Sequence, residues 1–147
     1  MKNELLRHAI AAIIYRFNKA IAHTTEGFGE YKVSDHTRSP NEIVNHMTDL
    51  ALKAIMMVSE GHFNSPAPAS LTFKNEVIRF NESLTAFSKV LEAKELHASL
   101  AKKLLQGPVL DMATHVGQIA MLNGLNGNKV PKENYFAADV RNSHPEE

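Results

Sequence analysis

Three side chains on two stretches of helical pattern have the types and spacing needed to bind one divalent metal ion. His46 lies three residues after Ile43 and four before Leu50, so its side chain shares a helix face with these apolar residues. His115 has a similar place on a later segment, and Asp111 precedes it by four residues, about one helical turn. If the two segments pack together at this level, two imidazoles and one carboxylate can bind an ion and leave positions open for water or substrate. The pattern therefore indicates a catalytic metal site rather than a closed, structural one.

Each of the three residues also has an ordinary structural explanation. A buried imidazole without a partner costs about 1–3 kcal/mol, and most histidines on apolar faces are simply hydrogen-bonded within the protein. An aspartate in the first turn of a helix can interact with the helix N-terminus, and an Asp and a His four residues apart can form a surface pair. The spacing alone leaves both interpretations open.

Other polar residues are candidates for supporting roles around the ligands. Asn45, Thr114 and Gln118 lie one or three positions from a candidate ligand, where they can orient its imidazole through a hydrogen bond. On a third predicted helix an acid or a substrate anchor can come from three residues, Arg79, Asn81 and Glu82. For Arg79 and Glu82 a surface ion pair is the simpler explanation, because they are three residues apart. Two loop histidines, His36 and His62, are candidates for lining a pocket.

The elements that must position these residues are helical, because apolar residues recur at intervals of three and four and no stretch alternates as a strand does. Ser39, Pro40 and Glu42 form a capping box with proline at the first helical position. Gly107 and Pro108 predict a break, with Pro108 starting the last helix. The predicted helices cover residues 4–22, 40–60, 73–91, 96–104 and 108–125. The fold class expected is all-α, an up-down four-helix bundle with an additional short helix.

The segments outside these helices differ in character. Residues 23–39 contain two glycines and several Thr and Ser, and a loop of this length is expected to form a lid or a wall of the site. After residue 125 the pattern becomes polar, with Val130, Tyr135 and Phe136 expected to pack back and residues from about 137 to 147 expected to fray. The length of 147 residues fits a single domain spanning 1–147.

Composition excludes several kinds of function. The chain has no cysteine, so disulfides, thiolate metal sites and a cysteine nucleophile are ruled out. With 16 basic and 16 acidic residues it lacks the positive field expected of a nucleic-acid-binding protein. The apolar run 9–15 is too short to span a bilayer and has no signal-peptide cleavage pattern, so a cytoplasmic location without membrane association is expected. A homodimer is also expected, because Ile14, Ile55 and Val90 fall outside the main apolar stripes and would need cover.

Two segments resemble one known family. LLQGPVLDMATHVGQIAMLNGLNG, at 104–127, looks like the last core helix of the DinB/YfiT-like superfamily, where a His-x-x-x-His pair is followed by an Arg-Gly-Gln type sequence. Here His115-Val116-Gly117-Gln118 matches that ending. IVNHMTDL, at 43–50, resembles the family's helix-two segment with its single metal-binding histidine, which is His46 in this chain. Asp111 stands where the family's pair usually has its first histidine.

The resemblance implies a four-helix bundle that holds one divalent metal ion (Zn, Ni, Fe or Mn) on His46, Asp111 and His115. It further implies a small-molecule substrate and a thiol-dependent transferase, isomerase or hydrolase-like activity, with a low-molecular-weight thiol as a further cofactor. The ion would lower the pKa of a bound thiol or water. Two other functions stay open: a non-catalytic helical ligand-binding or stress-response module with a degenerate metal site, and a purely structural homodimer subunit.

Overall fold

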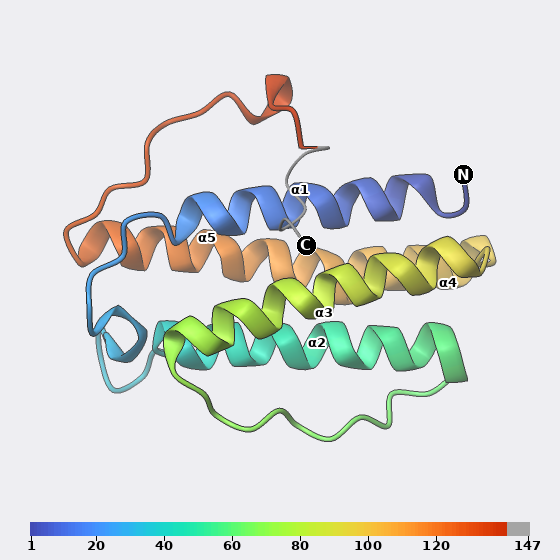
Figure 1. The fold of residues 1–147 in the computed structure, drawn as a ribbon, viewed down its shortest axis with the longest axis horizontal. Helices are drawn as coiled ribbons and strands as arrows, with labels where there is room; N and C mark the ends of the chain where they lie inside the picture. The colour runs from blue at the N-terminus through green and yellow to red at the C-terminus, as the bar shows by residue number, and fades with distance from the viewer. Residues whose placement is uncertain (141–147) are drawn as a thin grey trace.

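The computed structural model describes residues 1–140, and these form helices and connecting segments without any strand (Figure 1). The all-α expectation is therefore confirmed for this part of the chain. No helix within it has the length and apolar character needed to cross a membrane. The elements are α1 (Glu4–Ala20), η1 (Phe28–Glu30), α2 (Pro40–Glu60), α3 (Phe73–Ala93), α4 (Ala98–Leu104), the π-helical turn η2 (Leu105–Val109), α5 (Leu110–Leu125) and η3 (Tyr135–Ala137).

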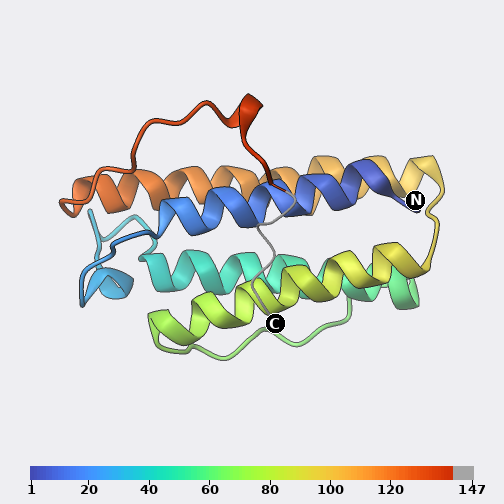
Figure 2. The same cartoon turned by 45° about the horizontal axis from the view of Figure 1, so that its top comes forward.

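The direction of the helices differs from the simple up-down order expected. α2 and α3 lie side by side and run the same way, and so do α1 and α5 in the opposite direction, which gives the two layers seen in Figure 2. Residues 61–72 make this possible by returning along the whole of α2 (Figure 1). At roughly 3.3 Å per residue this extended segment reaches about 40 Å, whereas α2, with 21 residues, is about 32 Å long. Pro66 and Pro68 favour the extended conformation.

The predicted short helix is present as α4, but the break predicted after it at Gly107 and Pro108 is wrong. α4, η2 and α5 follow one another without a gap, and the residues at both junctions have right-handed helical backbone angles. A proline inside an α-helix lacks the N–H donor and its ring clashes with the carbonyl four residues earlier. A π turn is wider, so it can hold Pro108 without ending the helix. The result is one long fourth helix whose second half starts just before Asp111.

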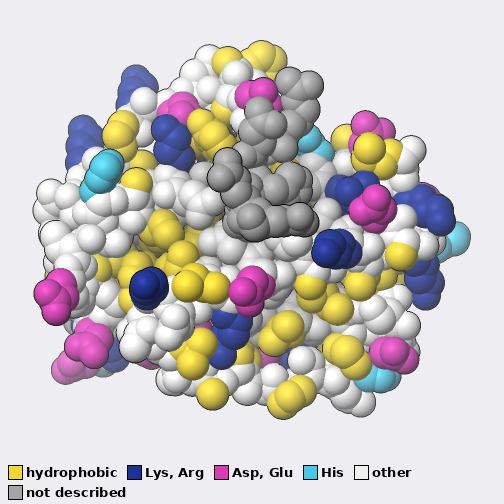
Figure 3. All heavy atoms as spheres, in the orientation of Figure 1, with side chains coloured by type: hydrophobic (Ala, Val, Ile, Leu, Met, Phe, Trp, Pro, Cys, Tyr) yellow, Lys and Arg dark blue, Asp and Glu magenta, His cyan; other side chains and the backbone are white. Residues whose placement is uncertain are grey.

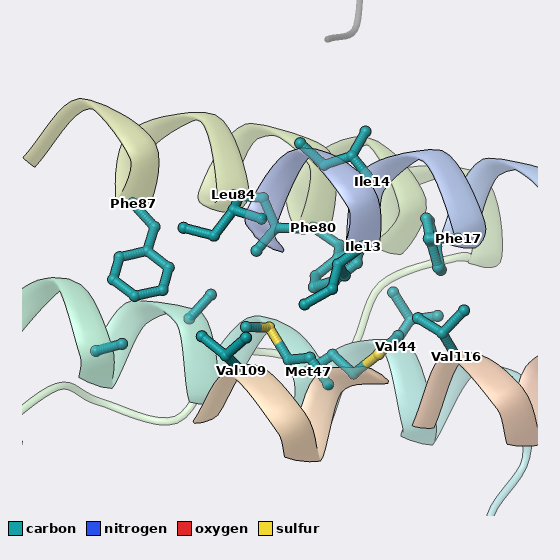
Figure 4. Close-up of a cluster of buried hydrophobic side chains, with 14 of the residues drawn as sticks. Ile13, Ile14, Phe17, Val44, Met47, Phe80, Leu84, Phe87, Val109 and Val116 are labelled. Atoms are coloured by element: carbon teal, nitrogen blue, oxygen red, sulfur yellow. The ribbon is translucent and has the colours of Figure 1, made fainter. Parts of the chain in front are cut away.

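The hydrophobic core lies between the two layers (Figure 4), where side chains from all four helices point toward one another. The rings of Phe17 and Phe80 meet edge to face, with centroids 4.8 Å apart. Met47 and Val116 belong to this cluster and directly follow His46 and His115 in the chain. Each histidine is therefore next in sequence to a residue buried in the core.

The residues on which the homodimer expectation was based are accounted for within one chain. Ile14 is completely buried, and Ile55 and Val90 are partly buried against the same core. The helix stripes are simply wider than the sequence pattern suggested. On the face drawn in Figure 3, hydrophobic side chains form small groups among charged and polar ones. These three positions thus give no reason to expect a dimer.

The segment after α5 crosses back over α1 (Figures 1 and 2) and is attached by polar and ring contacts. The Tyr15 hydroxyl donates to Glu133 at 2.8 Å, and Lys19 Nζ lies 2.9 Å from the same carboxylate. The Arg16 guanidinium lies 4.0 Å from the centre of the Tyr135 ring. Tyr135 thus packs back as expected.

Two further expectations for this segment have different outcomes. Phe136, expected to pack back, is instead completely exposed. In the stretch 137–147, which was expected to fray, Val140 is buried and residues 141–147 lie outside the described residues.

We expect acid to release this segment from α1. The hydrogen bonds from Lys19 and Tyr15 and the charges of Lys19 and Arg16 lower the pKa of Glu133 below its ordinary value of 4.5, so the docked form favours the carboxylate. That contribution is complete above pH 4.5 and is lost as pH falls through the lowered pKa. NMR shifts of the Tyr135 ring should report the release. Glu133→Gln should show the released shifts already at pH 7, and identical shifts in the two proteins at pH 7 would contradict the prediction.

Candidate metal centre

The three side chains picked out from the sequence converge between α2 and α5. His46 Nε2 lies 3.9 Å from Asp111 Oδ2, and His115 Nε2 lies 3.5 Å from Asp111 Oδ1. One donor atom from each residue lies within 4.8 Å of the other two. Donors about 2.1 Å from a tetrahedral ion lie roughly 3.4 Å from one another, so small side-chain movements bring these three into coordination range. The group can therefore hold a metal ion.

Burial differs among the three residues in a way that leaves one side of the centre open. The His115 side chain is 10% exposed and the His46 side chain 29%, whereas the Asp111 side chain is 47% exposed. The imidazole rings are nearly perpendicular, with centroids 4.9 Å apart. Two ligands are thus held by the protein interior while the third faces solvent. Water or a substrate can approach from the Asp111 side.

Gln118 orients the buried histidine. Its Oε1 lies 2.8 Å from His115 Nδ1. An amide oxygen can only accept a hydrogen bond, so with this amide orientation Nδ1 carries the proton and Nε2 keeps its lone pair. That lone pair lies on the side of Asp111, where a metal ion would bind. Of the three residues expected to orient the imidazoles, Gln118 makes such a contact.

Asn45 and Thr114 do not have the orienting roles suggested by the sequence. Asn45 Nδ2 lies 3.2 Å from the carbonyl oxygens of Pro68 and Ala69 and 3.2 Å from Glu76 Oε2. The Thr114 hydroxyl donates to the Leu110 carbonyl at 3.0 Å, within its own helix. Thr114 therefore binds backbone, and Asn45 binds backbone and the Glu76 carboxylate, so neither contacts a candidate ligand.

The candidate anchors on α3 also have structural partners. Arg79 pairs with the buried Glu76, not with Glu82 as expected. Asn81 Nδ2 donates to the Val77 carbonyl at 3.1 Å. His62, one of the two histidines expected near a pocket, is exposed and accepts from Asn64 N at 3.2 Å.

The electrostatic surroundings of His46 favour its neutral form. Burial lowers its pKa below the ordinary 6.5, with the charge of Arg38 and the neighbouring His115 adding to the effect, while Asp111 and Asp49 act weakly in the opposite direction. At pH 7 the imidazole is therefore neutral, which is the form that binds metal. Sequence reasoning missed both Arg38 and Asp49. Asp49 lies three residues after His46 on the same helix face, and this spacing predicts that its charge acts on His46. Arg38 lies in a loop, where no sequence pattern relates it to His46.

The loop before α2 forms one wall of a pocket that reaches Gln118, although none of the three candidate ligands lines this pocket. This pocket of about 440 Å³ lies between this loop and α5, and His36 is among its lining residues, as anticipated. The loop is anchored by Phe28, which is buried and meets the Phe73 ring at 5.4 Å. Gly29 lies so close to Asn41 and Phe73 that a Cβ at this position would overlap both side chains. The wall is thus fixed to α2 and α3.

Two imidazoles and one carboxylate of this arrangement can bind a divalent ion on one side and leave coordination positions open on the other. Comparisons with protein-family models, with characterised proteins and with solved structures gave no match to this chain.

Proposed function

We propose that this protein is a metal-dependent enzyme of the DinB/YfiT-like type. The observation that carries the proposal is the convergence of His46, Asp111 and His115, which bring three donor atoms within 4.8 Å of one another from two helices. The open side at Asp111 and the adjoining pocket support a catalytic rather than a structural role. We further propose that it acts in the cytoplasm on a small molecule rather than on nucleic acid.

The chain's own residues have separable tasks in this proposal. His115, held by Gln118, and His46, kept neutral by its surroundings, present nitrogen lone pairs to the centre. Asp111 contributes an oxygen at the exposed side. A bound divalent ion would supply Lewis acidity, which lowers the pKa of a thiol or a water so that it becomes a nucleophile near pH 7.

The test begins with metal uptake. Protein purified without an affinity tag is dialysed against Zn²⁺, Ni²⁺, Mn²⁺ and, without oxygen, Fe²⁺, and its metal content is measured by mass spectrometry. We expect one ion per chain for at least one metal. Uptake of all four no greater than that of a double variant with His46→Ala and His115→Ala would overturn the proposal.

A second function, a non-catalytic binding module, is favoured by one feature. Asp111 is shorter than histidine and is 47% exposed, so the third ligand is the least firmly held. Activity separates the two functions: the metal-loaded enzyme should accelerate the reaction of cysteine with an alkylating reagent or the hydrolysis of p-nitrophenyl acetate. A binding module would take up metal or ligand without accelerating either reaction.

A further inference from the structure

The pocket next to Gln118 is built mainly from two elements, with Ile43 of α2 at its base. The loop before α2 supplies Val33, His36, Thr37 and Arg38, and α5 supplies residues spaced over two turns, Gln118, Met121, Leu122 and Leu125. Its volume of about 440 Å³ lies within the range of small-molecule sites. Because Gln118 both lines the pocket and bonds to His115, the pocket adjoins the metal centre.

The wall of this pocket is apolar and exposed. Met121 is 69% exposed, Leu125 53% and Val33 51%, while Leu122 and Ile43 beneath them are buried. Met121 and Leu125 lie one turn apart on α5, so they form one stripe with Gln118 and Leu122. Single exposed apolar residues are common, but a group of them around a concavity marks a binding site for an apolar body.

The rim of the pocket carries positive charge. Arg38 is exposed and lines the pocket, and within residues 1–140 its guanidinium has neither an ion pair nor a hydrogen bond. Its charge also contributes to the lowered pKa of His46. His36 is the other titratable group among the described lining residues, and none of these is a carboxylate. An anion entering this pocket would therefore meet the charge of Arg38 and no carboxylate among the residues that line it.

We propose that this pocket binds a small amphipathic carboxylate, with the carboxylate on Arg38 and the apolar body along Met121, Leu122 and Leu125. A guanidinium binds a carboxylate through two parallel hydrogen bonds, so one arginine suffices for this group. A phosphate dianion usually requires several cationic or N–H partners, and the pocket offers only one arginine among its described residues. The proposal rests on the proposed function in that it names the substrate class of the same site.

Octanoate is a suitable probe, and metal-free protein in EDTA keeps this test independent of the metal centre. Isothermal titration should show saturable octanoate binding, weakened roughly tenfold in Arg38→Gln. Octanamide, which lacks the charge, should bind the natural protein as weakly as octanoate binds Arg38→Gln. Leu125→Asp should abolish binding, because it places a carboxylate on the apolar wall.

Lys89→Gln is the matched control, since Lys89 is an exposed cation on α3 and does not line this pocket. It should bind octanoate as the natural protein does, and circular dichroism should show all variants folded. Equal binding of octanoate and octanamide, no effect of Arg38→Gln, or tighter Arg38-dependent binding of octyl phosphate would each overturn the proposal. Octanoate binding by a protein that takes up no metal would contradict the proposed enzyme function and support the carboxylate site. Metal uptake without octanoate binding would contradict the carboxylate site and support the proposed metal centre.

Discussion

Replacing His115 by alanine should lower the affinity for Zn²⁺ by about 100- to 1000-fold. Zinc bound by four protein ligands gains roughly 10–16 kcal/mol at pH 7, so one ligand accounts for about 3–4 kcal/mol of it. His115 is the most buried of the three candidate ligands and is already oriented by Gln118, so little of its contribution is lost to ordering. Competition with a chromophoric chelator at pH 7 measures the change.

Neighbouring variants show whether the loss comes from coordination. Gln118→Ala should cost about tenfold, the usual effect of removing a partner that orients a metal-bound imidazole. Thr114→Ala should leave affinity unchanged, since that hydroxyl bonds to the Leu110 carbonyl. His46→Ala and Asp111→Ala should each empty the centre as His115→Ala does. Three merely packed residues would change stability in urea without this shared loss of metal, and that pattern would contradict the prediction.

The candidate ligand set could be predicted from sequence because helical spacing fixes which side chains share a face. His46 and His115 lie on apolar stripes, and Asp111 lies one turn before His115. The structure brings the three together because α2 and α5 are neighbours in the bundle. That adjacency is a property of tertiary packing, which periodicity alone does not encode. The spacing therefore identified the three candidate residues, but it could not predict the distances between their donor atoms.

The errors about the fold arose where local signals were overruled by packing. Pro108 is a strong local stop signal, yet a π turn absorbs it and the helix continues. Pro66 and Pro68 keep residues 61–72 extended, and an extended run of this length can return along α2 so that α3 runs parallel to it. Neither outcome alters the hydrophobic pattern, so the pattern could not distinguish them.

The polar residues that were missed or misassigned share a different cause. Arg38 affects His46 from a loop, where no periodicity relates the two positions. Asn45 is adjacent to His46 in sequence, but successive side chains on a helix point about 100° apart, so it reaches the 61–72 segment instead. Adjacent positions on a helix are thus poor predictors of supporting contacts, whereas Gln118, three residues from His115, makes one.

Replacing Glu76 by alanine should lower the free energy of unfolding by about 3–5 kcal/mol, the usual cost of breaking a buried ion pair. Glu76 is 1% exposed. Its carboxylate pairs with Arg79, accepts from Leu71 N at 3.1 Å and lies 3.2 Å from Asn45 Nδ2. Removing it leaves the Arg79 guanidinium without its counter-ion and the Leu71 N–H without its acceptor, where α2, α3 and the returning segment meet. Urea unfolding followed by circular dichroism measures the loss.

Glu92→Ala is the matched control, because Glu92 also pairs with an arginine, Arg7 at 3.4 Å, but its side chain is 64% exposed. An exposed pair contributes less than about 1 kcal/mol, so this variant should stay close to the natural protein. Similar losses of unfolding free energy in the two variants would show that the Glu76 carboxylate does not hold residues 61–72 against α2 and α3. Zinc affinity should change little in Glu76→Ala while the protein remains folded, since Asn45 contacts no candidate ligand. Residues 61–72 would then stabilise the parallel pair α2 and α3. The candidate metal centre would need this segment only to keep the protein folded.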